Sequence, residues 1–186
     1  MGTVLALDAA TLLNACGGST PPHDPMWVVT TLAGSEFPDF ADGKGALASF
    51  YGPNGMAADI SGQLYVADTY NNRIRKISPA GVVSTLAGST TSGSADGTAA
   101  SFNYPYGVAV DGSGNVFVAD QRNHLIRQIS PSGEVSTLAG SGSAGSDDDT
   151  GTAASFSSPQ GVAVDDHGYV FVADYNNHLI RQINPE

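Results

Sequence analysis

The chain has 186 residues, and its net charge of −11 comes from seven basic residues against eighteen carboxylates. Nucleic-acid binding needs clustered cations that displace phosphate counterions, so we expect no nucleic-acid partner. The single cysteine excludes an internal disulfide framework, and no apolar run is long enough to predict a membrane-spanning helix.

Residues 1–26 differ in composition from the rest and predict an N-terminal tail. The stretch Leu13-Asn14-Ala15-Cys16, followed by Gly, Ser and Pro, resembles the end of a bacterial lipoprotein signal in which Cys16 is lipidated. Such a signal begins with positive charge, whereas no basic residue precedes Cys16 and Asp8 interrupts the apolar stretch. The signal interpretation predicts an extracytoplasmic protein, either a cell-envelope lipoprotein or a secreted one. A tail with an unrelated cysteine is the alternative.

Residues 27–186 contain three copies of one sequence pattern. Val-Ala-Asp segments end at Asp68, Asp120 and Asp174, with spacings of 52 and 54 residues. Thr-Leu-Ala-Gly and Pro-x-Gly motifs recur with them, starting at Thr31, Thr85 and Thr137 and at Pro53, Pro105 and Pro159. A fixed period of this size indicates stacked copies of one supersecondary unit. The units are about 27–81, 82–133 and 134–186.

The second copy predicts four strands separated by short turns rich in Gly, Pro, Asp and Ser. The expected strands are 107–110, 116–119, 125–129 and 134–138. Four antiparallel strands in about 50 residues, without helical periodicity, are typical of a β-propeller blade. Small residues such as Gly107 and Ala109 suit the crowded propeller axis. Phe50, Phe102 and Phe156 are expected to pack between neighbouring blades.

A family signature follows the second strand of two copies. It reads Asn123-His124-Leu125 and Asn177-His178-Leu179, and the first copy departs from it with Asn71-Asn72-Arg73. With the Pro-x-Gly and Val-Ala-Asp motifs, this resembles the NHL-repeat β-propeller family. The resemblance implies an all-β propeller of four-stranded antiparallel blades, with three blades' worth per chain. It does not fix a function, because one fold carries both binding modules and enzymes.

The expected strands make up three blades' worth, but the chain begins one strand out of phase with the blades. The chain starts with an outermost strand, Trp27–Leu32, and stops after the third strand of its last blade. Propellers have roughly four to eight blades, so three blades do not close a ring. In one interpretation a homodimer closes a six-bladed ring, and each N-terminal strand completes the partner's last blade. A fragment of a longer propeller and a monomeric arc are the alternatives.

Most polar residues that recur are interpreted as structural. Each of Asp68, Asp120 and Asp174 precedes an arginine by seven residues, which places the pair on adjacent strands of one hairpin; these arginines are Arg75, Arg127 and Arg181. A salt bridge that locks each blade is expected. His124 and His178 are expected to cap turns, His167 to lie in a solvated turn, and His23 belongs to the tail. No catalytic residue is assigned.

Asp147-Asp148-Asp149 is the one acidic cluster that invites comparison with a calcium loop. Calcium loops space their oxygen ligands at alternate positions and end in a bidentate Glu, whereas these carboxylates are consecutive and lack that Glu. A solvated acidic loop is therefore expected, with a weak surface calcium site as the alternative. No residue set has the spacing of a structural zinc site, so we expect no cofactor.

Function is expected in the loops where the copies differ. In a four-stranded meander the turn between the second and third strands emerges beside the long loop between blades. Tyr70, Arg122 and Tyr175 lie in these turns and are the candidate partner contacts, because Tyr and Arg are favoured interface anchors. We expect a non-enzymatic binding scaffold for a protein or glycan partner. The alternative, implied by six-bladed relatives, is a metal-dependent lactonase- or lyase-like enzyme at the channel mouth.

Overall fold

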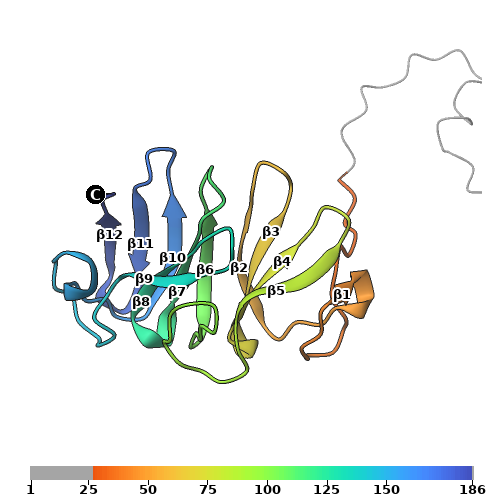
Figure 1. Ribbon diagram of the computed structural model, residues 1–186, viewed down its shortest axis with the longest axis horizontal. Helices are drawn as coiled ribbons and strands as arrows, with labels where there is room; N and C mark the ends of the chain where they lie inside the picture. The colour runs from red at the N-terminus through yellow and green to blue at the C-terminus, as the bar shows by residue number, and fades with distance from the viewer. Residues whose placement is uncertain (1–26, 186) are drawn as a thin grey trace, which may run out of the picture. The chain divides into compact units, whose positions relative to one another are not determined.

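The structure is a computed structural model that describes residues 27–185 (Figure 1). The tail 1–26, with His23 and the candidate lipidation site Cys16, lies outside the described residues. Every described strand belongs to the unit Thr31–Glu186. Within the described part, no helix is long and apolar enough to cross a membrane.

Three antiparallel sheets make up this unit, and we call them blades 1, 2 and 3. Blade 1 contains, in sheet order, β1 (Gly43–Lys44), β5 (Val82–Gly88), β4 (Arg73–Ile77), β3 (Leu64–Asp68) and β2 (Pro53–Ala58). Blade 2 contains β6 (Pro105–Val110), β7 (Val116–Asp120), β8 (Leu125–Ile129) and β9 (Val135–Ala139). Blade 3 contains β10 (Pro159–Val164), β11 (Val170–Asp174) and β12 (Leu179–Ile183). The all-β propeller class and the three blades are confirmed, and the blades do not close into a ring.

A short 3-10 turn joins the second and third strands of every blade. These turns are η3 (Thr69–Asn71), η4 (Gln121–Asn123) and η6 (Tyr175–Asn177). Two more, η2 (Gly45–Leu47) and η5 (Gly151–Ala153), lie in the long loops that precede β2 and β10. In Figure 1, η3 and η4 lie at the lower end of their blades, opposite the hairpin loops. We call the end of the blades that carries η3, η4 and η6 the loop face.

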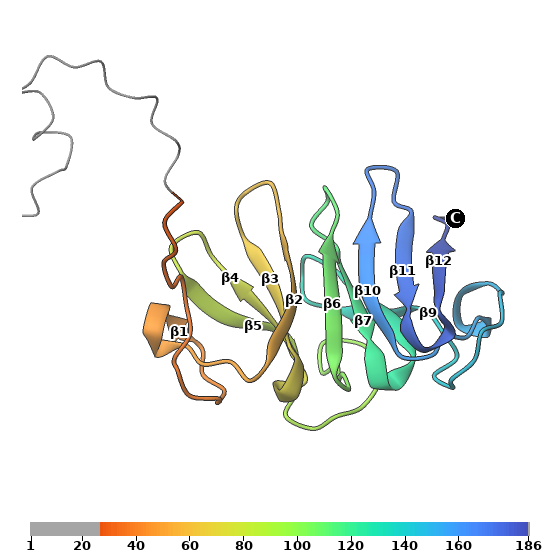
Figure 2. The same cartoon turned by 180° about the vertical axis from the view of Figure 1, so that it is seen from behind.

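The innermost strands of the three blades lie side by side, with β6 between β2 and β10 (Figures 1 and 2). Their backbones approach closely at Gly107, where an added Cβ would lie 3.1 Å from the backbone nitrogen of Val162 and also meet the backbone of Gln160. A residue without a side chain is therefore required at this point. The expectation that small residues occupy the axis is confirmed at Gly107.

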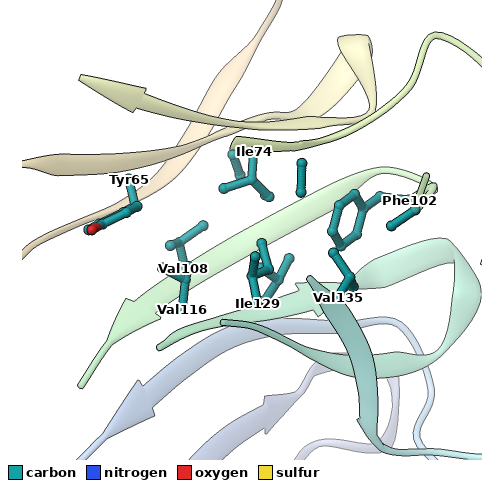
Figure 3. Packing of buried hydrophobic residues seen from close by; sticks show 11 residues of the cluster. Tyr65, Ile74, Phe102, Val108, Val116, Ile129 and Val135 are labelled. Atoms are coloured by element: carbon teal, nitrogen blue, oxygen red, sulfur yellow. The ribbon is translucent and has the colours of Figure 1, made fainter. Parts of the chain in front are cut away.

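Apolar side chains from neighbouring blades pack face to face and hold the blades together. Between blades 1 and 2, Tyr65 and Ile74 face Phe102, Val116 and their neighbours (Figure 3). Between blades 2 and 3, Phe156 packs in the equivalent cluster and is 2% exposed. The expected role of the repeated phenylalanines between blades is thus confirmed for both of these interfaces.

One predicted strand is absent. Residues Trp27–Leu32 form no strand, and the large apolar side chains among them are exposed. An outermost strand forms only by pairing with the edge of a third strand, and the described residues before β2 supply no such edge. The strand prediction for this segment was therefore wrong for the single chain.

Replacing Phe102 with alanine should lower the free energy of unfolding by about 3–5 kcal/mol, because the ring is fully buried between blades 1 and 2. Urea unfolding followed by circular dichroism measures the change. The matched control Phe37→Ala removes a ring that is 77% exposed and should shift stability by less than about 0.5 kcal/mol. Equal losses for the two variants would contradict the interblade role of Phe102.

Candidate functional site

The loop face is organised by a buried aspartate in each blade. In blade 1 the carboxylate of Asp68 is fully buried, and its Oδ1 accepts the backbone N–H of Tyr51 at 2.7 Å. Its Oδ2 accepts bonds from the guanidinium of Arg75 at 2.6 Å and from the side-chain amide of Asn71 at 2.9 Å. One carboxylate thus joins the end of the long loop, the η3 turn and the strand β4. We call this arrangement the aspartate hub.

The hub recurs in the other blades, which confirms the predicted pairing. Arg127 donates to Asp120 at 2.9 Å, and Arg181 donates to Asp174 at 3.1 Å. Each arginine also binds a second aspartate that the sequence analysis missed. These second partners are Asp42 at 2.7 Å, Asp96 at 2.5 Å and Asp148 at 2.6 Å. The sequence feature that could have revealed two of them is the Ala-Asp-Gly motif shared by the first two long loops, at residues 41–43 and 95–97.

The second partners change the interpretation of the acidic cluster. Asp148 is bound to the guanidinium of Arg181, while the backbone carbonyl of Asp147 accepts from the same arginine at 3.0 Å and from the N–H of Ser155 at 3.1 Å. Asp147 and Asp148 therefore take part in the third hub, while all three aspartates are exposed, as expected of a solvated acidic loop. Among residues 27–185, no group of three or more His, Cys, Asp or Glu side chains is placed to hold a metal ion.

Burial raises the pKa of Asp120 to about 6. Desolvation disfavours the charged carboxylate and raises the pKa. The hydrogen bonds from Asn103 and Asn123 and the charge of Arg127 lower it, but by less. In blade 2 the buried carboxylate is therefore harder to ionise than a free aspartate, although Asn103, Asn123 and Arg127 all donate to it.

The signature position after η3 and after η4 links one blade to the next. Asn72 and His124 adopt the left-handed conformation, with φ values of 52° and 57°. The Oδ1 of Asn72 accepts the backbone N–H of Tyr104 at 3.0 Å, and the Nδ1 of His124 accepts that of Ser158 at 3.0 Å. The expected structural role is confirmed for His124. His167 lies in its predicted solvated turn with its side chain 81% exposed.

Three tyrosines and one arginine form a continuous surface across blades 1 and 2, which we call the tyrosine row. Tyr51 and Tyr70 stack with ring centroids 4.8 Å apart, and Tyr104 meets the ring of Tyr70 edge-on at 5.0 Å. The guanidinium of Arg122 lies 3.5 Å above the ring of Tyr104. Tyr51 and Tyr70 remain 46% and 48% exposed, so the row combines ordered rings with open surface.

The hubs hold this row in place through the backbone. The N–H of Tyr51 is fixed by Asp68, and its carbonyl accepts the N–H of Tyr70 at 3.1 Å. The ring of Tyr70 lies against Gly52, where φ is 60° and any added Cβ would collide with that ring. Tyr104 adopts a φ of 58°, an uncommon value for an aromatic residue, and is held there by Asn72. Rigid support of exposed rings is the arrangement expected of a binding surface.

The structure unites two of the three predicted contact residues. Tyr70 and Arg122 lie in the tyrosine row, with Tyr104 between them. Tyr175 lies in η6 of blade 3, is 58% exposed, and makes none of the described ring contacts. Sequence reasoning missed Tyr51 and Tyr104, although Tyr104 directly precedes the proline of a Pro-x-Gly motif and Tyr51 stands two residues before the equivalent proline.

The comparisons with known proteins agree with this architecture. The family model described as NHL repeat matches residues 50–77, 102–129 and 156–183, one match in each blade. The chain belongs to the NHL-repeat family. Each match begins at one of the repeated phenylalanines, Phe50, Phe102 and Phe156, and ends at the last residue of the third strand, so an NHL repeat here contains the whole aspartate–arginine hairpin.

Relatives of this NHL protein are larger. It is 35% identical over 150 residues to the Arabidopsis thaliana protein SUPPRESSOR OF QUENCHING 1, chloroplastic, covering 73% of this chain and 14% of the relative. A structural genomics protein of unknown function from Bacteroides thetaiotaomicron is similar with a TM-score of 0.65 and 28% identity, over 70% of this chain and 34% of that one. An auxiliary nutrient binding protein from the same organism is similar with a TM-score of 0.64 and 22% identity, over 76% of this chain and 38% of that one. The latter likeness shows the fold alone.

The carboxyl carbon of Asp120 should titrate in NMR with a midpoint near 6, above the ordinary value of 3.8. Because its folded pKa is raised, protonation favours the folded state, so the contribution of Asp120 to stability falls as pH rises from about 4 to 6. Asp120→Asn identifies the signal and removes this pH dependence. A midpoint below 3.8 would contradict the dominance of desolvation.

Proposed function

We propose that this NHL protein is a non-enzymatic binding scaffold and that its loop face holds a protein or glycan partner through the tyrosine row. The observation that carries the proposal is a set of exposed rings fixed by the fold: the stacked pair Tyr51 and Tyr70, continued by Tyr104 and Arg122. Tyrosine offers a large amphipathic surface that loses little conformational entropy on binding, and Tyr and Arg dominate binding hot spots.

The charge distribution supports a neutral or basic partner. The chain has eleven more acidic than basic groups, and Arg122 lies over the ring of Tyr104 rather than in a cationic cluster. An exposed aromatic surface that lacks concentrated charge suits the apolar face of a sugar ring or an apolar protein patch. The row extends over two blades, so contacts are shared between segments that the hubs hold in fixed positions.

Replacing Tyr70 with alanine should weaken binding by about 30-fold or more, because this ring is the central member of the row. The probes are an array of immobilised oligosaccharides and an array of purified cell-envelope proteins, with affinities then measured by calorimetry. Tyr169→Ala is the matched control, because Tyr169 follows a turn at the opposite end of blade 3, and it should bind within twofold of the wild type.

Unchanged affinity of the Tyr70→Ala variant would place the binding site elsewhere. Tyr175→Ala separates the contributions of the blades: a loss comparable to that of Tyr70→Ala would extend the surface to blade 3. Chemical conversion of a bound lactone or glycoside that depends on an added metal would instead favour the alternative, a lactonase- or lyase-like enzyme.

We further propose an extracytoplasmic location with a lipid anchor at Cys16. The sequence Leu13-Asn14-Ala15-Cys16 and the Gly, Ser and Pro residues that follow it support this proposal. In bacterial cells that are fed an alkyne-labelled fatty acid, the wild-type chain should carry the label and Cys16→Ser should not. Equal labelling of the two proteins, or no labelling of the wild type, would remove Cys16 as the anchor.

We also propose that two chains pair to form one six-bladed ring. The outer face of blade 3 supports this, because Phe171 and Ile180 are 36% and 78% exposed. Their counterparts in blade 2, Phe117 and Ile126, are 5% and 0% exposed, since blade 3 covers them. The face of blade 3 thus repeats a surface that elsewhere in the chain is buried against a following blade.

A further inference from the structure

The outer edge of blade 3 has an open strand position. In blades 1 and 2 the third strands β4 and β8 are covered by β5 and β9, whereas β12 pairs only with β11 among the described strands. A cleft of about 1150 Å³ runs along β12, and β9 and the loop around residues 146–151 form its other walls. The backbone groups of such an edge are available for pairing with a further strand.

The third hub lacks one bond that the other two hubs have. Thr85 on β5 bonds through its hydroxyl to Asp42 at 3.3 Å, and Thr137 on β9 bonds to Asp96 at 3.2 Å. The equivalent carboxylate, Asp148, is held by Arg181 but has no threonine partner among residues 27–185. Its side chain is 93% exposed, against 47% for Asp42 and 51% for Asp96.

The segment 28–34 has the sequence of an outer strand. It reads Val-Val-Thr-Thr-Leu-Ala-Gly and differs from β5, Val-Val-Ser-Thr-Leu-Ala-Gly, at one position only. Thr31 occupies the position of Thr85. In the structure this segment forms no strand, and Val28 and Val29 are 79% and 96% exposed. The segment 28–34 therefore has the sequence of a strand and exposed apolar side chains, but no strand edge beside it to pair with.

Part of the same segment already follows the path of an outer strand. The carbonyl of Leu32 lies 3.2 Å from the position of an added Cβ at Gly81, just as that of Leu86 on β5 lies 3.3 Å from the equivalent point at Gly133. Leu86 thus contacts the blade that follows its own. Leu32 contacts blade 1 in the same way, so residues 31–34 occupy the outer-strand position of a blade that would precede blade 1.

We propose that β12 and Asp148 form a docking site for the segment Val28–Gly34 of a second copy of this chain. The pairing of β4 with β5 and of β8 with β9 predicts the register: Thr31 opposite Arg181, Thr30 opposite Gln182, and Val29 opposite Ile183. The hydroxyl of Thr31 then donates to the carboxylate of Asp148. The site rests on the proposed pairing of two chains but is independent of partner binding by the tyrosine row.

Disulfide trapping tests the docking site on the full chain carrying Cys16→Ser. The double variant Thr30→Cys with Gln182→Cys should form a covalent dimer under mild oxidation, because directly opposed residues have Cβ atoms about 5 Å apart. The matched control Val29→Cys with Gln182→Cys should not, since a shift of one residue turns the side chain to the other face. Mass spectrometry under non-reducing conditions identifies the products.

The hydroxyl of Thr31 gives a second measurement that does not depend on cysteines. Thr31→Val keeps the branched shape but removes the donor to Asp148, and it should raise the dimer dissociation constant about tenfold per site. The control Thr30→Val changes a residue whose counterparts on β5 and β9 are the exposed Ser84 and Ser136, and it should leave the constant within twofold. Analytical ultracentrifugation provides both constants.

The remaining outcomes separate this site from the pairing itself. A mass of 18.9 kDa at all concentrations would overturn both the docking site and the proposed pairing. A dimer that crosslinks equally with the Val29 and Thr30 cysteines, or with neither, would keep the pairing but overturn the docking site. A disulfide within one chain at monomer mass would show that the segment closes its own ring, which overturns the second-copy occupant.

Discussion

The buried aspartate carboxylate of each blade is the constraint on which the rest of the structure depends. A charge removed from water is tolerated only when donors surround it. Asp68 meets this condition with the backbone of Tyr51, the amide of Asn71 and the guanidinium of Arg75. Those three donors belong to a loop, a turn and a strand, so satisfying one charge fixes three segments. The geometry of the loop face is set by these bonds to the buried carboxylate.

Sequence reasoning could predict the part of each hub that lies within a hairpin. Asp68 and Arg75 are seven residues apart across a short turn, and two strands joined in this way must pair. The second aspartate was not predictable by the same argument, because Asp42 reaches Arg75 from 33 residues away through an irregular loop. Likewise, Tyr51 and Tyr70 are neighbours only because a hub folds the end of that loop over the η3 turn.

Residues 27–32 show a second limit of prediction from sequence, in which the local preference is clear but the strand does not form. Their sequence nearly equals that of β5, so local preference favours a strand, yet the strand predicted there is absent from the single chain. Strand formation, however, requires an edge with matching donors and acceptors, which β4 provides for β5. The same residues in the same order are thus strand or irregular chain according to what lies beside them.

The separation of backbone and side chain explains how three near-identical repeats present different surfaces. At the middle of each η turn the backbone N–H donates to the long loop: Tyr70 to Tyr51, Arg122 to Asn103, and Asn176 to Ser157. These bonds use no side-chain atom, so this position can carry a ring, a guanidinium or an amide without change to the hub. The residues that build the blade are therefore constrained to repeat, whereas those that face solvent are free to differ. A propeller of this kind can acquire a binding surface at its loop face without loss of stability in its scaffold.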